Sequence, residues 1–274
     1  MSVNSETMGF LMRQYRSLPT IRVIGDVAES EDDLIAIESA LELRLNNEFL
    51  AAFVCSPSLE KELSLGYLLS TGVIKSFNDI DELKYSGNRC YVRVRENKVQ
   101  QIGFSRVQRF IGTECSAPDV LKQLRTASGL PSISKPVTVS LQKIRETAKI
   151  MRKSQTGREL TGALHGALVH SLTEDKYVVA EDLGRHNAAD KAIGLAVLQD
   201  FHLSECLMMS SGRLTADIVS KCAWAGIPLL VSFAVTTVAG IKFAQKANLT
   251  LVGAFKGKKM RIYNQGACKM LHPS

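Results

Sequence analysis

The first third of the chain alternates apolar and polar residues in short runs. Leu41, Leu43 and Leu45 alternate with charged residues, which is typical of a half-buried strand. Two asparagines at 46–47 suit a tight hairpin turn, so residues 49–55 are expected to return as the partner strand. A helix is predicted over residues 59–71, and strands over 90–94 and 99–104. Residues 1–128 are therefore expected to form a small α+β domain that ends in a loop at 105–118.

The pattern changes after residue 129. Strands are predicted at 163–172, 177–181, 206–210, 229–233, 249–255 and 260–264. Helices are predicted at 119–127 and 140–154, and then between the strands at 187–199, 215–225 and 238–247. Strands that alternate with helices favour a layered α/β domain with parallel strands, here residues 129–274. The expected fold class is thus α/β, with a smaller N-terminal α+β domain.

Composition agrees with a folded, water-soluble protein. Of the 274 residues, 45% are hydrophobic and 22% charged, which excludes a disordered or fibrous chain. The net charge of +7 predicts an anionic partner, and leaves nucleic acid, a phosphorylated cofactor and an acidic protein open. The uncharged run 225–241 contains Pro228 and two glycines, which favours a buried strand and helix over a membrane span. We expect no signal peptide, no membrane association and a cytoplasmic location.

Six cysteines give no zinc-binding spacing and no disulfide framework. We therefore expect no metal site and a reducing compartment. Cys115 differs from the other five because its neighbours are small or polar. It precedes a predicted helix start at Pro118, a position that lowers a thiol pKa, although Glu114 next to it acts in the opposite direction. The residues alone leave open whether Cys115 is a nucleophile or an incidental loop cysteine.

Two strand-to-helix turns carry a glycine beside an arginine. They comprise Gly184, Arg185, His186 and Asn187 after one strand, and Ser211, Gly212 and Arg213 after another. A third turn, at 234–237, carries two threonines. The carboxyl ends of parallel strands share one edge of a sheet, where helix N-termini and arginines can bind phosphate. The alternative is that Asn187 and Thr215 are helix N-caps and that the arginines are solvated.

The same residues carry a resemblance to a known family. Residues 181–194, which read EDLGRHNAADKAIG, resemble the signature of the FdhD/NarQ family of formate dehydrogenase accessory sulfurtransferases. So do the segments 41–46, 55–57, 65–68, 211–213, 225–228 and 249–253. The resemblance extends from about residue 41 to 263.

The resemblance implies a function for the chain. Family members take sulfur from a cysteine desulfurase as a persulfide, which falls here on Cys115. They pass it to molybdenum (or tungsten) bis(molybdopterin guanine dinucleotide), bound as substrate, for insertion into the formate dehydrogenase apoenzyme. Their cofactor-binding stretch carries over to Phe255, Lys256, Gly257, Lys258, Lys259 and Met260. The family also implies a cytidine-deaminase-like fold for the larger domain, here without the zinc signature, and a possible homodimer.

One position departs from the family pattern. Family members usually carry a Cys-x-x-Cys pair in the loop, whereas here the second cysteine is replaced by Pro118. Our main hypothesis is a sulfurtransferase with a Cys115 persulfide. The alternatives are a non-catalytic cofactor-binding chaperone of formate dehydrogenase and, from another class, a deaminase or RNA-binding relative. We favour the first, with no nucleic acid as partner.

Overall fold

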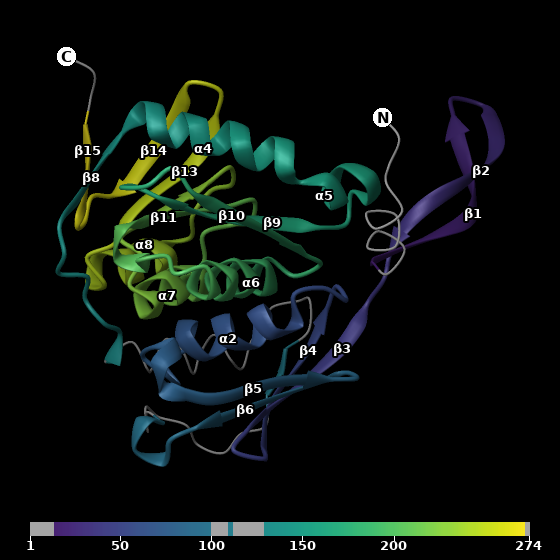
Figure 1. The fold of residues 1–274 in the computed structure, drawn as a ribbon. Helices are drawn as coiled ribbons and strands as arrows, with labels where there is room; N and C mark the ends of the chain where they lie inside the picture. Colours follow the sequence, from purple (N-terminus) through teal and green to yellow (C-terminus); the bar gives the residue numbers. More distant parts are fainter. Residues whose placement is uncertain (1–13, 100–108, 112–128, 272–274) are drawn as a thin grey trace.

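A computed structural model describes residues 14–99, 109–111 and 129–271 (Figure 1). The N-terminal part consists of a two-stranded arm, a five-stranded sheet and one helix. Its elements are β1 (Tyr15–Ile24), β2 (Val27–Ala36), β3 (Ser39–Leu45), β4 (Glu48–Cys55), α2 (Glu60–Ser70), η1 (Phe77–Asp79), β5 (Ile80–Ser86), β6 (Arg89–Val94), η2 (Glu96–Lys98) and β7 (Arg109–Ile111). The strand order in the sheet is β5-β6-β3-β4-β7.

The C-terminal part is built around a six-stranded sheet of order β10-β9-β11-β12-β13-β14. Its elements are β8 (Val137–Ser140), α4 (Leu141–Ser154), α5 (Thr156–Thr161), β9 (His165–Ser171), β10 (Tyr177–Asp182), α6 (Arg185–Leu198), η4 (Leu203–Glu205), β11 (Cys206–Ser210), α7 (Ala216–Ala225), β12 (Leu229–Ser232), α8 (Val238–Lys246), β13 (Thr250–Lys256), β14 (Lys259–Asn264) and β15 (Cys268–Leu271). Strands β11, β12 and β13 are parallel, while β9 and β14 run antiparallel to their neighbours.

The elements stack in layers. Helix α4 covers one face of the six-stranded sheet, and α6, α7 and α8 cover the other (Figure 1). Helix α2 packs on α6 and α7 and separates them from the five-stranded sheet. One hydrophobic core cluster contains residues of both parts, from Leu41 on β3 to Leu251 on β13. Within the described residues, none of the helices is long and apolar enough to cross a bilayer.

Most of the expected elements are confirmed, as is the mixed α/β class. Helix α4 follows from its sequence: Ser140 caps it by accepting the N–H of Lys143 at 3.1 Å, and Ile144, Ala148 and Met151 lie on its buried face. The arm β1–β2, strands β5, β8 and β15, and the short helix α5 were not predicted from the sequence. The loop predicted at 105–118 is wrong at residues 109–111, because strand β7 pairs there with β4. The strand predicted at 99–104 and the helix at 119–127 lie outside the described residues, apart from Val99, and the boundary at 128 stays a prediction.

Helices α2 and α6 cross at very short range because each presents a glycine to the other. A Cβ on Gly194 would lie 2.0 Å from the backbone oxygen of Glu62, and one on Gly66 would lie 1.8 Å from that of Asp190. The backbone of each helix thus fills the space that a side chain of the other would need. This contact joins the N-terminal and C-terminal parts, so it is central to the stability of the whole fold.

We therefore expect Gly194→Ala to lower the free energy of unfolding by at least about 2 kcal/mol, because backbone atoms cannot move aside as a flexible side chain would. Urea denaturation measures this change. Gly129→Ala is the control, since no atom lies within 4 Å of a Cβ there; its effect should stay within about 0.5 kcal/mol. Equal effects of the two substitutions would contradict the packing described.

Candidate functional site

The turns singled out in the sequence lie along one edge of the six-stranded sheet. Strands β11, β12 and β13 end there, and so does β10, while the antiparallel β9 begins there. We call this edge the rim; it holds His165, the turns 183–187, 211–213 and 234–237, and the hairpin between β13 and β14. Six strands about 4.8 Å apart make it roughly 24 Å wide. The sequence-based expectation that these turns lie side by side is confirmed.

The carboxylate of Asp182 fixes the first turn. Its Oδ1 accepts the backbone N–H of Gly184 at 2.9 Å and the side-chain amide of Asn187 at 3.0 Å. Its Oδ2 lies 2.6 Å from Nζ of Lys191 and accepts the N–H of Ser56 at 3.0 Å. Helix α6 begins at Arg185 with Gly184 as its N-cap residue, two residues earlier than predicted. The reading of Asn187 as the N-cap is therefore wrong, because its amide instead bonds inward, to Asp182 and to the carbonyl of Val54.

The second turn packs directly against the first. A Cβ on Gly212 would lie 2.8 Å from Cδ and 2.9 Å from Cβ of Arg185, so only glycine leaves room for the arginine stem. The hydroxyl of Ser210 accepts the N–H of Gly212 at 3.1 Å, and the hydroxyl of Ser232 donates to the Gly212 carbonyl at 2.6 Å. The backbone of this turn is thus held from two neighbouring strands.

A positively charged cluster lies around these two turns, and it was not predicted as a whole from the sequence. The imidazole Nδ1 of His165 lies 3.2 Å from the Ser211 hydroxyl, which also accepts the N–H of Gly166 at 3.0 Å. Burial, and then the charges of Arg158, Arg185 and Arg213, lower the pKa of His165. Arg158 lies on α5, a helix the sequence did not reveal, and no local motif marks it.

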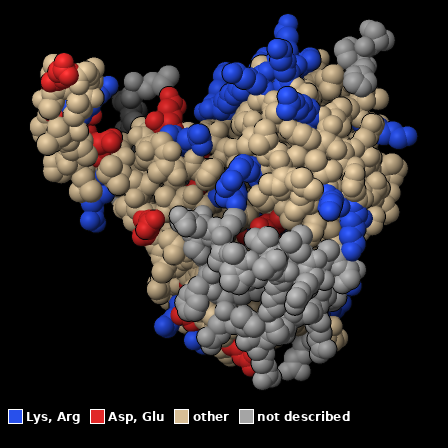
Figure 2. All heavy atoms as spheres, turned by 180° about the vertical axis from the view of Figure 1, so that it is seen from behind, with Lys and Arg blue, Asp and Glu red and all other residues tan. Residues whose placement is uncertain are grey.

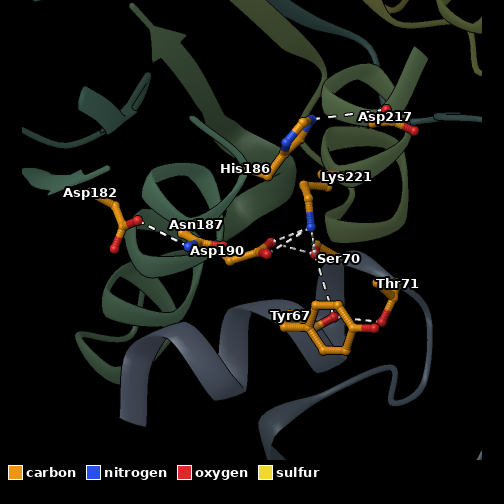
Figure 3. A network of polar contacts seen from close by, with 9 residues as sticks. All are labelled: Tyr67, Ser70, Thr71, Asp182, His186, Asn187, Asp190, Asp217 and Lys221. Carbon is orange, nitrogen blue, oxygen red and sulfur yellow. Dashed lines mark hydrogen bonds and ion pairs between the residues drawn. The ribbon is translucent and has the colours of Figure 1, made fainter. Parts of the chain in front are cut away.

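His186 and Asn187 do not point outward as ligands would. The imidazole Nε2 of His186 lies 3.9 Å from the carboxylate of Asp217, and burial lowers its pKa to about 3, with Lys221 and Arg185 adding to the effect (Figure 3). Below it, Lys221 pairs with Asp190 at 2.7 Å, and Asp190 accepts the Ser70 hydroxyl at 2.6 Å. The network of contacts at this end of α6 is therefore internal, and of the residues 184–187 Arg185 is the one whose charge acts on His165.

The predicted cofactor-binding stretch forms the tip of the β13–β14 hairpin. Lys256, Gly257, Lys258 and Lys259 are exposed, and Gly257 has a φ of 61° in the turn. Phe255 is buried and packs edge-on against Phe233, with ring centroids 6.1 Å apart. Its side chain belongs to the core, because it fills the space between the sheet and α4, and a role of Phe255 in cofactor binding stays a prediction. Met260 is half-buried against the same core.

Basic side chains gather on this side of the molecule. Figure 2 shows Lys and Arg concentrated at the top of the face seen from behind, where α4 and the β13–β14 hairpin lie. The exposed basic residues of these elements are Lys149, Arg152, Lys153, Lys256, Lys258, Lys259 and Arg261. Together with the arginines of the turns, they make the rim a surface suited to phosphate groups.

Five cysteines, Cys55, Cys90, Cys206, Cys222 and Cys268, are buried and free. Burial raises the pKa of all five thiols, to about 12 for Cys55, Cys206 and Cys268. They are therefore poor nucleophiles at neutral pH. Cys115 and Pro118 lie outside the described residues. No group of three metal-ligating side chains is found among the residues that the structure does describe.

Fold and rim define an α/β protein whose strand-end edge is suited to a phosphorylated ligand. Comparison with known proteins identifies the family to which this α/β protein belongs. A model of the FdhD/NarQ family matches residues 36–268, and the chain belongs to this family.

Alignments with related proteins extend over nearly the whole chain. The chain is 33% identical over 247 residues to the "Sulfur carrier protein FdhD" of Saccharolobus solfataricus, covering 89% of this chain and 93% of that one. It is 32% identical over 259 residues to the protein of the same name in Wolinella succinogenes, covering 91% and 90%. A crystal structure described as a formate dehydrogenase accessory protein from Desulfotalea psychrophila has the same fold, with a TM-score of 0.72 at 22% identity over 92% of this chain and 97% of that chain.

The buried His186 predicts a pH dependence of stability. Because its pKa is about 3 in the folded protein, against 6.5 ordinarily, the unfolded chain binds a proton in this window that the folded chain does not. Above pH 6.5 the His186 imidazole does not reduce the free energy of unfolding. On acidification below that pH, this group lowers the free energy of unfolding by roughly 1.4 kcal/mol per pH unit. We expect His186→Gln to make the slope of unfolding free energy between about pH 6 and 4 shallower by that amount, measured by urea denaturation. His202→Gln, at an exposed imidazole, should leave the slope as it is; an unchanged slope in His186→Gln would refute the assignment.

Proposed function

We propose that this protein is a sulfur carrier that receives sulfur as a persulfide on Cys115 and transfers it to a molybdenum or tungsten bis-guanine-dinucleotide cofactor for formate dehydrogenase. The observation that carries the proposal is membership of the FdhD/NarQ family, whose relatives bear the name sulfur carrier protein. The partners in this proposal are a cysteine desulfurase, the formate dehydrogenase apoenzyme and the cofactor as bound substrate. The proposed location is the cytoplasm, and the proposed fold of residues 129–274 is cytidine-deaminase-like.

The choice of Cys115 is supported by the state of the other thiols. The chain has six cysteines, and the five in the described residues are buried with raised pKa values. A persulfide carrier needs a thiolate that a desulfurase can reach. By elimination, Cys115 is the cysteine to which this role falls.

The loading of Cys115 with sulfur needs no redox partner, whereas release of the sulfur as sulfide needs a thiol as reductant. The thiolate of Cys115 attacks the outer sulfur of the desulfurase persulfide, a new S–S bond forms, and the desulfurase cysteine leaves as a thiolate. Release of sulfide from Cys115 then needs a second thiol, which attacks Sγ of Cys115 and becomes half of a disulfide. Since Pro118 stands where family members have a second cysteine, that thiol comes from another molecule in this mechanism.

The rim supports the second half of the proposal. A guanine dinucleotide carries phosphates, and Arg158, Arg185 and Arg213 together with the lysines of the β13–β14 hairpin place positive charge along one edge. Arginine binds phosphate through two parallel hydrogen bonds, whereas lysine acts as a point charge. We assign the phosphate contacts to the arginines and the hairpin lysines, and a supporting role to His186 and Asn187, which are turned inward.

Replacement of the second loop cysteine by Pro118 favours one alternative. The protein would then be a chaperone that binds the cofactor and docks on formate dehydrogenase without transferring sulfur. In that case cofactor delivery would survive loss of Cys115.

Sulfur loading distinguishes the two functions. After incubation with a cysteine desulfurase and cysteine, intact-protein mass spectrometry should show one added sulfur atom on the parent and none on Cys115→Ala. Cys206→Ala is the matched control, because it removes a buried thiol, and it should load like the parent. Equal loading of Cys115→Ala and the parent would exclude Cys115 as the carrier, and an unloaded parent that still delivers cofactor would favour the chaperone.

Binding of GDP, as a probe for the nucleotide half of the cofactor, tests the rim. Arg213→Gln should weaken GDP binding about tenfold, the size expected for a lost charge-assisted contact, as measured by isothermal titration calorimetry. Arg93→Gln alters an exposed arginine on β6 in the other sheet and should leave the affinity unchanged. The same affinity for Arg213→Gln and the parent, or no GDP binding at all, would argue against the rim as the cofactor site.

A further inference from the structure

The imidazole of His165 lies on the rim, between the last residue of β10 and the turn that follows β11. Strand β9 begins at His165 and runs between β10 and β11 in the sheet. Asp182 is its cross-strand partner on β10, and Ser211 lies on its other side. The side chain is half-buried, so part of the ring faces solvent at the rim.

One nitrogen of the imidazole is fixed by Ser211. The Ser211 hydroxyl lies 3.2 Å from Nδ1 and accepts the N–H of Gly166 at 3.0 Å, while the Ser211 N–H donates to the Gly166 carbonyl at 3.0 Å. Among the residues that the structure describes, Nδ1 is the acceptor within reach of the hydroxyl proton. A neutral imidazole that accepts at Nδ1 carries its own proton on Nε2. These hydrogen bonds therefore assign the ring proton of the neutral form to Nε2.

The other nitrogen, Nε2, is accessible to a ligand. Within residues 14–99, 109–111 and 129–271, no hydrogen bond or ion pair engages it, and it is not among the buried polar atoms that lack a partner. The neutral imidazole thus presents an N–H donor at the rim.

Positive charge surrounds this donor on three elements. Arg158 on α5 donates from Nη1 to the carbonyl of Leu164 at 3.2 Å, which places its guanidinium beside the start of β9. Arg185 on α6 packs its stem against Gly212, and Arg213 is exposed in the same turn. An anion that reaches Nε2 therefore enters a site with three guanidinium groups around it.

The other titratable groups beside the imidazole do not supply a matching negative charge. Asp182 pairs with Lys191, and Glu181 accepts two backbone N–H groups at the start of α5. His186 on α6 is neutral near pH 7, since its pKa is about 3. Burial and then the three arginines lower the pKa of His165, and Asp182 acts in the opposite direction. Without a ligand, the His165 imidazole is therefore neutral at neutral pH.

A phosphate group among the three arginines would reverse this balance. It offsets their charge and offers an oxygen atom to Nε2–H, and both effects favour the protonated imidazole. The protonated ring also keeps its contact with Ser211, because Nδ1–H then donates to the second lone pair of the hydroxyl.

We propose that His165 is a ligand for the diphosphate group of the bound nucleotide, and that its imidazole takes up a proton from solvent as the phosphate binds. The inference rests on the proposed function, since it adds a residue to the same site. Because the complex holds one proton more than the free protein, affinity rises as the pH falls, by at most about tenfold per pH unit. This rise is confined to the range between the pKa of the complex and the lower pKa of the free protein.

Isothermal titration calorimetry with GDP-mannose measures this coupling. A phosphate monoester loses its second proton near about pH 6, whereas both phosphates of GDP-mannose are esterified and keep their charge, so a change in protonation belongs to the protein. The parent should bind GDP-mannose at least about threefold more tightly at about pH 6 than at about pH 8. Titrations in buffers of different ionisation enthalpy should show net proton uptake at the lower pH.

Two substitutions isolate the imidazole. His165→Gln retains an amide donor but cannot titrate, so its affinity at about pH 8 should stay within about threefold of the parent, and the gain at about pH 6 should disappear. His202→Gln removes an exposed imidazole beyond the other end of α6 and should keep the pH profile of the parent. Circular dichroism should show both variants folded like the parent.

Three results would overturn the proposal, and they separate it from the proposed function. Equal pH profiles for His165→Gln and the parent would remove the role of His165 and leave the rim as a nucleotide site. Binding of GDP-mannose to the parent without proton uptake would do the same, independently of any variant. No binding of GDP-mannose or GDP to the parent would contradict both the role of His165 and the rim as the cofactor site.

Discussion

The structure depends on one buried ion pair. Asp182 and Lys191 are 2.6 Å apart with side chains fully removed from solvent. Burying two charges is costly, and the cost is offset only when the remaining polar atoms are also satisfied. Here Asp182 accepts hydrogen bonds from Ser56, Gly184 and Asn187, and Lys191 also donates to the Ser56 carbonyl. The pair therefore joins the end of β4 in one sheet to the start of α6 beside the other, and fixes the rim turn between them.

A second buried pair lies on the adjacent residue of α6. Asp190 pairs with Lys221 of α7 and accepts the hydroxyl of Ser70 on α2, although burial raises its pKa (Figure 3). Helix α6 is thus enclosed on several sides. Its buried residues Asn187 and Asp190 are matched to partners on β4, α2 and α7. Apolar contacts alone would allow the helices to slide, whereas these pairs and the close Gly66–Gly194 crossing define one register.

Local patterns predicted much of this architecture. The strands and helices between residues 163 and 264 follow from alternation, and strand direction placed the turns on a common rim. Interactions made by tertiary packing had no such signal. Glu181 accepts the backbone N–H groups of Gly157 and Arg158 and holds α5 at the rim, where the charge of Arg158 acts on His165. The arm was missed because a strand pair with no core beside it lacks the usual burial pattern. The burial of Phe255 was not predicted, because a residue's place in a motif does not show which way its side chain points.

The distribution of charge on the rim follows from the same contacts. The carboxylates at the end of β10 are engaged internally, Glu181 by backbone N–H groups and Asp182 by Lys191 and by donors on three further residues. The pKa of His165 is lowered first by burial and then by the charges of Arg158, Arg185 and Arg213, and Asp182 opposes this shift. A surface with these positive charges attracts phosphate before any specific contact forms. The interior pairing that stabilises the fold is therefore also what leaves the rim positive.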